Sequence, residues 1–176
     1  ALRLEALETG TTAAEALEFF DSLPPVDLEA MTGSWRGRGM PTGSPLDGML
    51  ERFGWHGKQF EGPDVAHPLV FDDGRGGVLS VNPARIPMGL MARAPALLNT
   101  LAVARIFRLL RPLLGTRKPT ARLRMTQYRG VVTATMIYDA VPINDAFRNV
   151  DDDTVIGVMD MRGLDQPFVF SLRREV

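Results

Sequence analysis

The sequence predicts a mainly β domain, an antiparallel β-barrel of about eight strands with helices before and between them. The chain has 176 residues, the size of one domain, and 45% hydrophobic residues, enough for a sizeable core. Short runs with strand character recur along it and are separated by turns rich in Gly, Pro and Asp. Consecutive antiparallel strands in this number avoid open edges best by closing into a barrel. The interior of such a barrel holds side chains or one small ligand.

We expect the single domain to cover residues 1–176, without repeats, low-complexity tracts or flexible linkers. Four parts follow one another along it. Residues 1–31 form a helical extension, residues 32–90 a first β part, residues 91–118 an inserted amphipathic helix, and residues 119–176 the C-terminal strands.

The N-terminal part contains a well-marked helix. Thr12 and Glu15 have the spacing of a capping box before the amphipathic run AAEALEFFDSL. Pro24 and Pro25 end this helix, because proline lacks the N–H that the next turn needs. Residues 27–31 add one short turn.

The first β part mixes strands with one more helix, which begins near Ser44 and runs to Gly54. Residues 72–77, DDGRGG, have the composition of a hairpin connection. The expected strands are Gly33–Gly39, Lys58–Phe60, Pro68–Phe71 and Val78–Val81.

The C-terminal part contains the clearest strands. Gly130 marks a tight connection between the first two, and residues 162–165 mark the last one. The expected strands are Ala121–Arg129, Val131–Asp139, Thr154–Met161 and Phe168–Arg174.

The inserted segment Pro95–Leu114, helical around 95–111, is the most apolar part of the chain. Three arginines and Pro112 make it a poor transmembrane candidate. Arg105, Arg108 and Arg111 fall together on one side of this helix. The opposite arc of about 180° is covered by Leu98, Val103, Ile106, Phe107, Leu109, Leu110, Leu113 and Leu114. One interpretation is a half-buried helix with its arginines in water. The alternative is a lid over a cavity, or contact with an anionic membrane surface through the three arginines.

The overall charge is balanced but unevenly distributed. Twenty basic and 21 acidic residues give a net charge of −1, which argues against a nucleic-acid partner. Residues 1–30 contain one basic and seven acidic residues, whereas residues 75–138 contain eleven basic residues and no acid. This polarity suits an anionic ligand, lipid surface or acidic partner. It equally suits an acidic N-terminal helix lying across the basic segment.

Several kinds of chemistry are excluded or disfavoured. The chain has no cysteine and only His56 and His67, which excludes thiolate and multi-histidine metal sites. Asp151–Asp153 lacks the alternating carboxylates of a calcium loop, so it is expected to form a turn or strand entry. No hydrolase elbow, phosphate loop or dinucleotide motif is present. We expect no metal, no cofactor and, since the first residues lack signal-peptide character, a cytoplasmic location.

The segment Gly33-Ser34-Trp35-Arg36-Gly37 resembles the signature of the calycins, which include lipocalins, fatty-acid-binding proteins and nitrobindin-like haem barrels. The resemblance implies that Trp35 closes one end of the barrel. It also implies that an arginine of the last strand, Arg173 or Arg174, packs over it in a cation–π contact. Gly33, Trp35, Gly37 and Arg173 are the expected structural signature.

A longer resemblance covers nearly the whole chain. It is similar to bacterial proteins named after the GXWXG motif, whose second half is labelled only as a domain of unknown function. This resemblance implies a fold rather than a chemistry. The matching stretches are residues 33–37, WHGKQF at 55–60, YRGVVTATMIYD at 128–139, PINDAFR at 142–148 and GVMD at 157–160.

These stretches contain polar side chains within apolar strands. Arg148 has the geometry to pair with Asp139, Asp145 or Asp160, or to bind a ligand carboxylate. A Lys58–Tyr138 or Tyr–Asp couple inside the barrel would suit proton transfer. The candidate ligand-binding residues are Trp35, Lys58, Tyr128, Met136, Tyr138, Arg148, Met159, Asp160, Phe168 and Phe170.

Three classes of function stay open. The first is an intracellular carrier or sensor that binds a fatty acid, lipid or isoprenoid-like molecule in the barrel. The second is an enzyme of isomerase or cyclase type on a hydrophobic substrate, which requires inward acid–base groups with shifted pKa values. The third is a haem-binding or protein-interaction barrel. Haem would need His56 or His67 as its ligand, and a histidine beside Pro68 is usually a loop residue.

Overall fold

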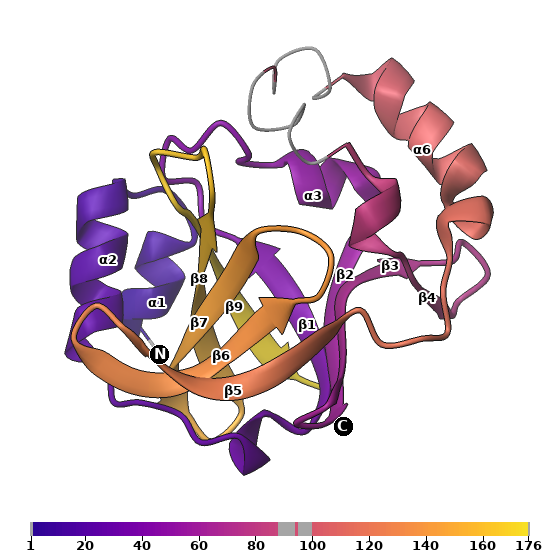
Figure 1. Ribbon diagram of the computed structural model, residues 1–176. Helices are drawn as coiled ribbons and strands as arrows, with labels where there is room; N and C mark the ends of the chain where they lie inside the picture. The colour runs from indigo at the N-terminus through magenta and orange to yellow at the C-terminus, as the bar shows by residue number, and fades with distance from the viewer. Residues whose placement is uncertain (1, 88–93, 95–99, 176) are drawn as a thin grey trace.

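The computed structural model describes residues 2–87, 94 and 100–175. Its centre is an antiparallel sheet that closes in a ring, which confirms the predicted fold class (Figure 1). The strand order is β2-β1-β9-β8-β7-β6-β5-β3-β4, and β2 also pairs with β3, which closes the ring and leaves β4 outside it. The strands are β1 (Gly33–Gly39), β2 (Trp55–Gly62), β3 (Val65–Asp72), β4 (Val78–Ser80), β5 (Ala121–Tyr128), β6 (Val131–Tyr138), β7 (Ile143–Asp151), β8 (Thr154–Met161) and β9 (Phe168–Arg174).

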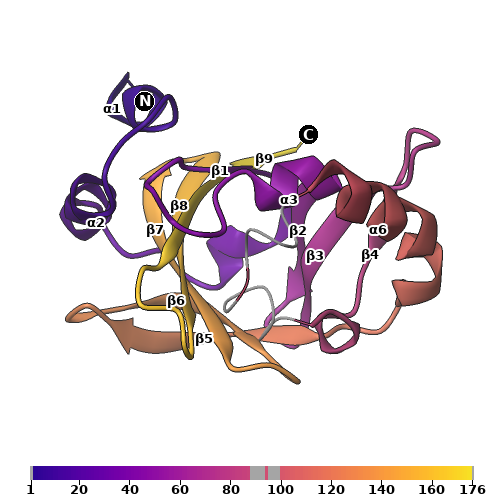
Figure 2. The ribbon, with the colours of Figure 1, turned by 90° about the horizontal axis from the view of Figure 1, so that it is seen from above.

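The helices lie outside the ring. Helices α1 and α2 cover the outer face near β7, β8 and β9, whereas α3 and α6 lie together on the other side of the molecule (Figures 1 and 2). One apolar cluster fills the ring, and a smaller one lies between α1, α2 and the sheet. The described helices are α1 (Leu2–Leu7), α2 (Ala13–Ser22), α3 (Met49–Phe53) and α6 (Leu101–Leu114), with the 3₁₀ turns η1 (Glu29–Met31) and η2 (Pro83–Arg85).

Local sequence signals account for many of these elements. Thr12 caps α2, and the Glu15 carboxylate accepts from the Thr12 backbone N–H in the predicted capping box. Residues 72–77 connect β3 to β4 as a hairpin. Arg129 and Gly130 connect β5 to β6 with positive φ angles of 48° and 81°, the conformation that a two-residue hairpin favours.

Three elements differ from the prediction. Strand β7 was missed, because the polar residues of INDAFRNVD interrupt the apolar alternation by which strands are identified. The helix expected from Ser44 is confined to Met49–Phe53. His67 is a buried residue of β3, not a loop residue, and its Nδ1 lies 3.1 Å from the Ser80 Oγ.

Helix α6 does not simply bury its apolar side and expose its arginines, as one interpretation of the sequence expected. It packs through the seam where its apolar and arginine arcs meet, so Ala104 and Arg111 are buried while much of the leucine arc is exposed. Pro112 lies inside its last turn and does not end it, since a proline there removes only one helical hydrogen bond. Residues 95–99 of the predicted helix lie outside the described residues. Among those described, no helix has the length and apolarity to cross a membrane.

Candidate functional site

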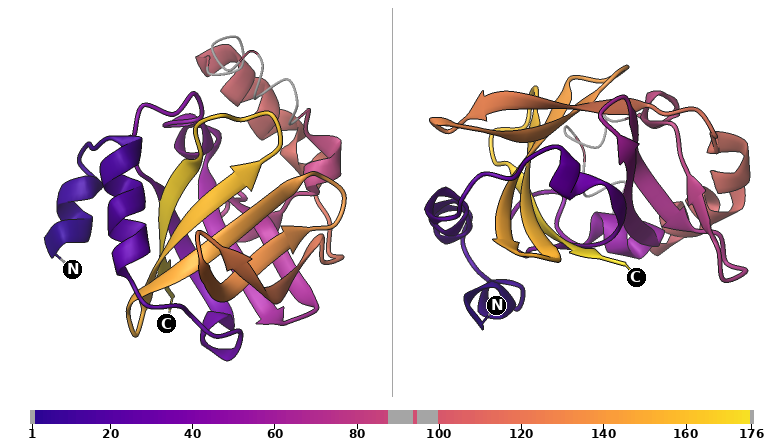
Figure 3. Two further views of the ribbon diagram at one scale, coloured as in Figure 1. Left: turned by 60° about the vertical axis from the view of Figure 1, so that its left-hand side comes forward. Right: turned by 90° about the horizontal axis from the view of Figure 1, so that it is seen from below.

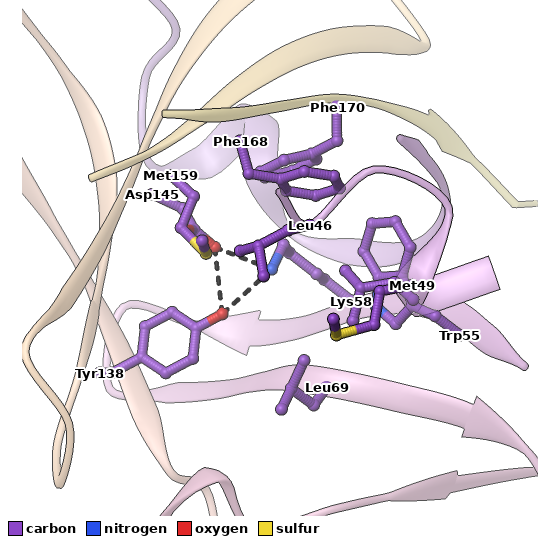
Figure 4. Close-up of a pocket in the computed structure, with 11 residues that line it drawn as sticks. Leu46, Met49, Trp55, Lys58, Leu69, Tyr138, Asp145, Met159, Phe168 and Phe170 are labelled. Atoms are coloured by element: carbon purple, nitrogen blue, oxygen red, sulfur yellow. Dashed lines mark hydrogen bonds and ion pairs between the residues drawn. The ribbon is translucent and has the colours of Figure 1, made fainter. Parts of the chain in front are cut away.

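The α3 end of the closed sheet contains a small cavity of about 30 Å³ (Figure 4). This is room for one or two water molecules but not for a lipid-sized ligand. The walls are apolar except at one place, where charged side chains meet. The lining residues are Leu46, Met49, Leu50, Trp55, Lys58, Leu69, Tyr138, Asp145, Met159, Phe168 and Phe170.

The polar part of the wall is a triad of Lys58, Tyr138 and Asp145. Lys58 Nζ lies 2.8 Å from Asp145 Oδ2, and their side chains are 3% and 1% exposed. Lys58 also donates to the Tyr138 hydroxyl at 3.4 Å and to the Pro68 carbonyl at 3.1 Å. The Tyr138 hydroxyl donates to Asp145 Oδ2 at 3.2 Å (Figure 4). All three ammonium hydrogens of Lys58 therefore have acceptors.

Strand alternation explains why these three side chains meet. Lys58, Tyr138 and Asp145 come from β2, β6 and β7, and each lies at an inward position of its strand. The aromatic wall stabilises the ammonium further, since Lys58 Nζ lies 4.9 Å from the centre of the Phe170 ring and 5.7 Å from that of Trp55.

Burial controls the protonation of the triad. Desolvation raises the pKa of Asp145 above its ordinary value, although Lys58 and Tyr138 oppose this by stabilising the carboxylate. Desolvation, reinforced by the neighbouring Asp145, raises the pKa of Tyr138 well above its ordinary value. Tyr138 is therefore a neutral hydrogen-bond donor at physiological pH.

Two buried polar atoms of the cavity wall have no hydrogen-bond partner among the described residues. They are Asp145 Oδ1, which can accept a hydrogen bond, and Trp55 Nε1, which can donate one. Buried polar atoms are nearly always paired, and an unpaired one costs about 1–3 kcal/mol. Both atoms belong to lining residues, so a bound molecule or water in the cavity is a candidate partner for each.

The cover of the cavity is a short segment. Leu46, Met49 and Leu50 close it from the segment that contains α3, a helix of five residues bounded by Gly48 and Gly54. Both glycines have left-handed backbone angles, with φ of 69° and 82°. The Phe53 ring packs on Phe107, and the Glu51 carboxylate accepts the Gly39 backbone N–H, so both contacts hold this cover in place.

Five of the predicted ligand-binding residues line the cavity and five lie elsewhere. Met136 is buried in the main core directly across from Asp145 in the β6–β7 register, but it does not line the cavity. Tyr128 packs edge-to-face against Phe20 of α2, on the outer side of the sheet. The lining residues are Lys58, Tyr138, Met159, Phe168 and Phe170; the others are Trp35, Tyr128, Met136, Arg148 and Asp160.

Arg148 does not pair with Asp139, Asp145 or Asp160, contrary to one interpretation of the sequence. Arg148 and Asp145 are three positions apart on β7 and so face opposite sides of the sheet. The guanidinium lies beneath α2, 5.1 Å from the centre of the Phe20 ring, and donates to the Leu23 carbonyl. Asp160 is exposed.

The tryptophan motif closes the opposite end of the ring. Trp35 is 1% exposed, and its Nε1 donates to the Met31 carbonyl of η1 at 2.8 Å. Arg174, not Arg173, lies over its ring at 4.3 Å, because Arg174 is directly across from Trp35 in the β1–β9 register. Arg173 points to the outer face and pairs with Glu8 of the segment after α1.

The second glycine of the motif has a steric reason. A Cβ at Gly37 would lie 2.3 Å from the Trp55 ring, so only glycine permits this ring to pack against β1. Residues of the motif therefore contribute to the packing at both ends of the ring. Trp35 closes one end, and Gly37 makes room for a wall residue of the cavity at the other.

The sequence did not single out Asp145 or the cover residues. Asp145 was named as one of three possible partners of Arg148 but not as a ligand-binding residue, because β7 was not recognised as a strand. Its signal is a carboxylate flanked by apolar neighbours, which is ambiguous without knowledge of the facing strand. The lining residues that were not predicted are Leu46, Met49, Leu50, Trp55, Leu69 and Asp145.

Neither histidine lines the cavity. His56 lies between carboxylates, with Nδ1 2.8 Å from Asp72 and Nε2 2.8 Å from Glu175. Within the described ranges, no group of three histidine, aspartate or glutamate side chains is arranged to hold a metal ion.

Comparisons with known proteins support the relationship that the motif suggested. The description "GXWXG protein" matches residues 18–76, and "Domain of unknown function (DUF4334)" matches residues 119–174. A crystal structure of a protein from Thermomonospora curvata is similar to the chain, with a TM-score of 0.72 and 32% identity over 99% of this chain and 97% of that one. None of the curated proteins compared with the chain matches it significantly. The chain belongs to the GXWXG family, with the domain of unknown function DUF4334 as its C-terminal part.

Proposed function

We propose that the chain binds a hydrophobic small molecule with a neutral hydroxyl head group inside the closed sheet, as an intracellular carrier or sensor. On this proposal the ring is a calycin-type barrel and the ligand is lipid- or isoprenoid-like. The observation that carries the proposal is the buried triad at an apolar cavity, with Asp145 Oδ1 unpaired.

The charge of the triad selects the head group. Lys58 and Asp145 together are neutral, so an entering carboxylate would lie beside the Asp145 carboxylate without a free cation to balance it. The ammonium hydrogens of Lys58 are already used by protein acceptors. What the wall lacks is a donor to Asp145 Oδ1. A hydroxyl group supplies one without adding charge, which favours an alcohol over a fatty acid.

The ligand requires the cavity to open, since about 30 Å³ holds only water. The mobile part on this proposal is the cover formed by Leu46, Met49 and Leu50. Methionine side chains adapt their shape easily, so Met49 and Met159 allow the walls to follow an aliphatic chain.

The proposal is tested by ligands that share one chain and differ in the head group. Displacement of an environment-sensitive fluorophore is measured for a hydrocarbon, its alcohol, its methyl ether and its carboxylate. We expect the alcohol to bind most tightly, because the ether cannot donate and the carboxylate is repelled. Native mass spectrometry of protein purified from its host provides the independent observation of a bound molecule.

Variants connect the preference to the triad. Lys58→Met/Asp145→Leu keeps the chamber apolar and should bind alcohol and hydrocarbon about equally. Asp160→Asn, on the exposed surface, is the control and should keep the preference. If no ligand binds the wild type and no molecule co-purifies, or if the double variant keeps the preference, the proposal is wrong.

A second candidate is an acid–base enzyme of isomerase or cyclase type. It is favoured by the specific contact of a buried tyrosine with both Lys58 and Asp145, a path along which a proton can move. The co-purifying molecule would be incubated with the protein and analysed for conversion. Conversion that is lost in Tyr138→Phe and kept in Tyr128→Phe would establish that the protein is an enzyme. If the molecule is unaltered, the carrier or sensor function is the one supported.

A further inference from the structure

Helix α6 exposes a strip of large apolar side chains. Leu109 and Leu113 are 80% and 73% exposed, and Ile106 and Leu110 on the same arc are also exposed. Single exposed leucines are common on protein surfaces, but Ile106, Leu109, Leu110 and Leu113 share one arc of the helix and form a strip. Such patches mark contacts with a membrane or another molecule.

The exposed strip results from how α6 is anchored. Phe107 packs against Phe53 and Phe71, with ring centres 5.1 Å apart in both pairs. Arg108 donates to the Arg52 carbonyl at 3.1 Å, and Arg111 is buried. These contacts hold the opposite side of the helix to α3 and β3 and direct the leucines outward.

The surroundings of this strip are positive. Residues 74–138 contain no acidic residue. Arg75, Arg105, Arg117 and Lys118 are exposed and form no ion pair with any described residue. The acidic helices α1 and α2 lie on the far side of the ring from α6 (Figures 1 and 3), so they do not neutralise this region. Among the described basic residues of this segment, Arg129 alone pairs with one of these helices, through Asp21.

A groove of about 350 Å³ runs between α6 and the β3–β4 hairpin. Arg75, Arg108 and Arg111 line it, and Asp73 is the one acid in its wall. The Asp73 carboxylate accepts the backbone N–H groups of Arg75 and Gly77. Arg111 is 7% exposed; desolvation and the neighbouring Arg108 lower its pKa, and Asp72 and Asp73 partly oppose this. Three guanidinium groups against one carboxylate in its wall leave the groove positive, which suits a phosphate group.

We infer that α6 docks on the surface of an anionic lipid bilayer. The helix lies in the plane of the interface with its leucines at the boundary of the acyl chains, and the flanking arginines meet lipid phosphates. This assigns the apolar side, rather than the three arginines alone, as the part that enters the membrane. A second copy of the chain fits less well, because it would bring two positive surfaces together.

The inference is tested by co-sedimentation with vesicles of phosphatidylcholine alone and of phosphatidylcholine mixed with phosphatidylglycerol. We expect binding to the anionic vesicles only, weakened by salt. Leu109→Ser/Leu113→Ser should weaken it about tenfold for each leucine replaced. Arg105→Gln should weaken it about fivefold. The controls are Leu2→Ser and Arg162→Gln, exposed residues away from α6 that should leave binding unchanged.

Three results would overturn the inference. One is a wild type that binds neither kind of vesicle, and another is equal binding by the leucine double variant and the Leu2→Ser control. The third is a dimer in solution that Leu109→Ser/Leu113→Ser dissociates, which would assign the strip to self-association. The variants lie outside the cavity, so ligand binding inside the ring is unaffected by any of these results.

Discussion

Lys58 and Asp145 form an ion pair inside the closed sheet, with Nζ and Oδ2 2.8 Å apart and both side chains almost fully buried. Removal of two charges from water costs several kcal/mol for each ion. The pair is tolerated because Pro68 and Tyr138 supply further hydrogen bonds. Its energetics therefore depend on both partners being present.

Replacement of one partner should destabilise the fold strongly. We expect Lys58→Met to lower the free energy of unfolding by about 3–5 kcal/mol, because it leaves the Asp145 carboxylate buried without a counter-charge. Lys58→Met/Asp145→Leu should lose much less. Urea denaturation of the two variants and the wild type measures this difference. The exposed pair of Arg122 and Asp139, 3.8 Å apart, is the control, and Arg122→Met should cost less than about 1 kcal/mol.

The contact between Arg174 and Trp35 should stabilise the fold in a way that only an arginine provides. Besides the ring contact, it donates to the Thr32 and Ala30 carbonyls at 2.6 and 2.7 Å. We expect Arg174→Ala to lower the free energy of unfolding by about 2–3 kcal/mol. Arg174→Lys should rescue little, since an ammonium cannot stack on the ring and reach both carbonyls. Full rescue by lysine, measured in urea, would show that only the charge matters.

Gly37 should be coupled energetically to Trp55. The methyl group of Gly37→Ala would lie 2.3 Å from the Trp55 ring, so the ring must move and the cavity wall must change. We expect a loss of about 1–3 kcal/mol and weaker ligand binding. Trp55→Phe makes room for the methyl group, so the double variant should be more stable than the sum of the single effects. Strict additivity in this double-mutant cycle would contradict the steric explanation.

Glu8 should make the attachment of α1 sensitive to acid. Burial alone would raise the pKa of Glu8, but hydrogen bonds from Arg173 and Ser171 outweigh it and lower the pKa. A carboxyl group with a lowered pKa stabilises the fold above its unfolded pKa of about 4.3 and loses this contribution as the pH falls through the folded pKa.

Thermal denaturation of wild type and Glu8→Gln across the acid range checks this effect. The variant should be less stable at neutral pH, and the two stability curves should converge below about pH 4. Glu5→Gln, an exposed neighbour on α1, should instead follow the wild type throughout. Parallel curves for wild type and Glu8→Gln would show that Glu8 carries no such linkage.

Short-range patterns were sufficient for much of the fold. The capping box at Thr12, the hairpin at residues 72–77 and the strands of the C-terminal part each depend on neighbouring residues, and all are confirmed. Strand β7 could not be identified in this way, because Asp145 and Arg148 give its sequence the polarity of a loop. Half of the candidate ligand-binding residues line the cavity, because the sequence does not specify where along the ring each inward side chain lies.

The sequence by itself determined the mainly β class, the closing tryptophan motif and the amphipathic character of the segment after residue 95. Only the tertiary structure decided that Asp145 meets Lys58 and Tyr138, that Arg174 covers Trp35, and that α6 turns its leucines outward. The physical reason is that periodicity specifies which residues share a face of one strand or helix. Which faces meet depends on strand register and on packing between segments far apart in the chain.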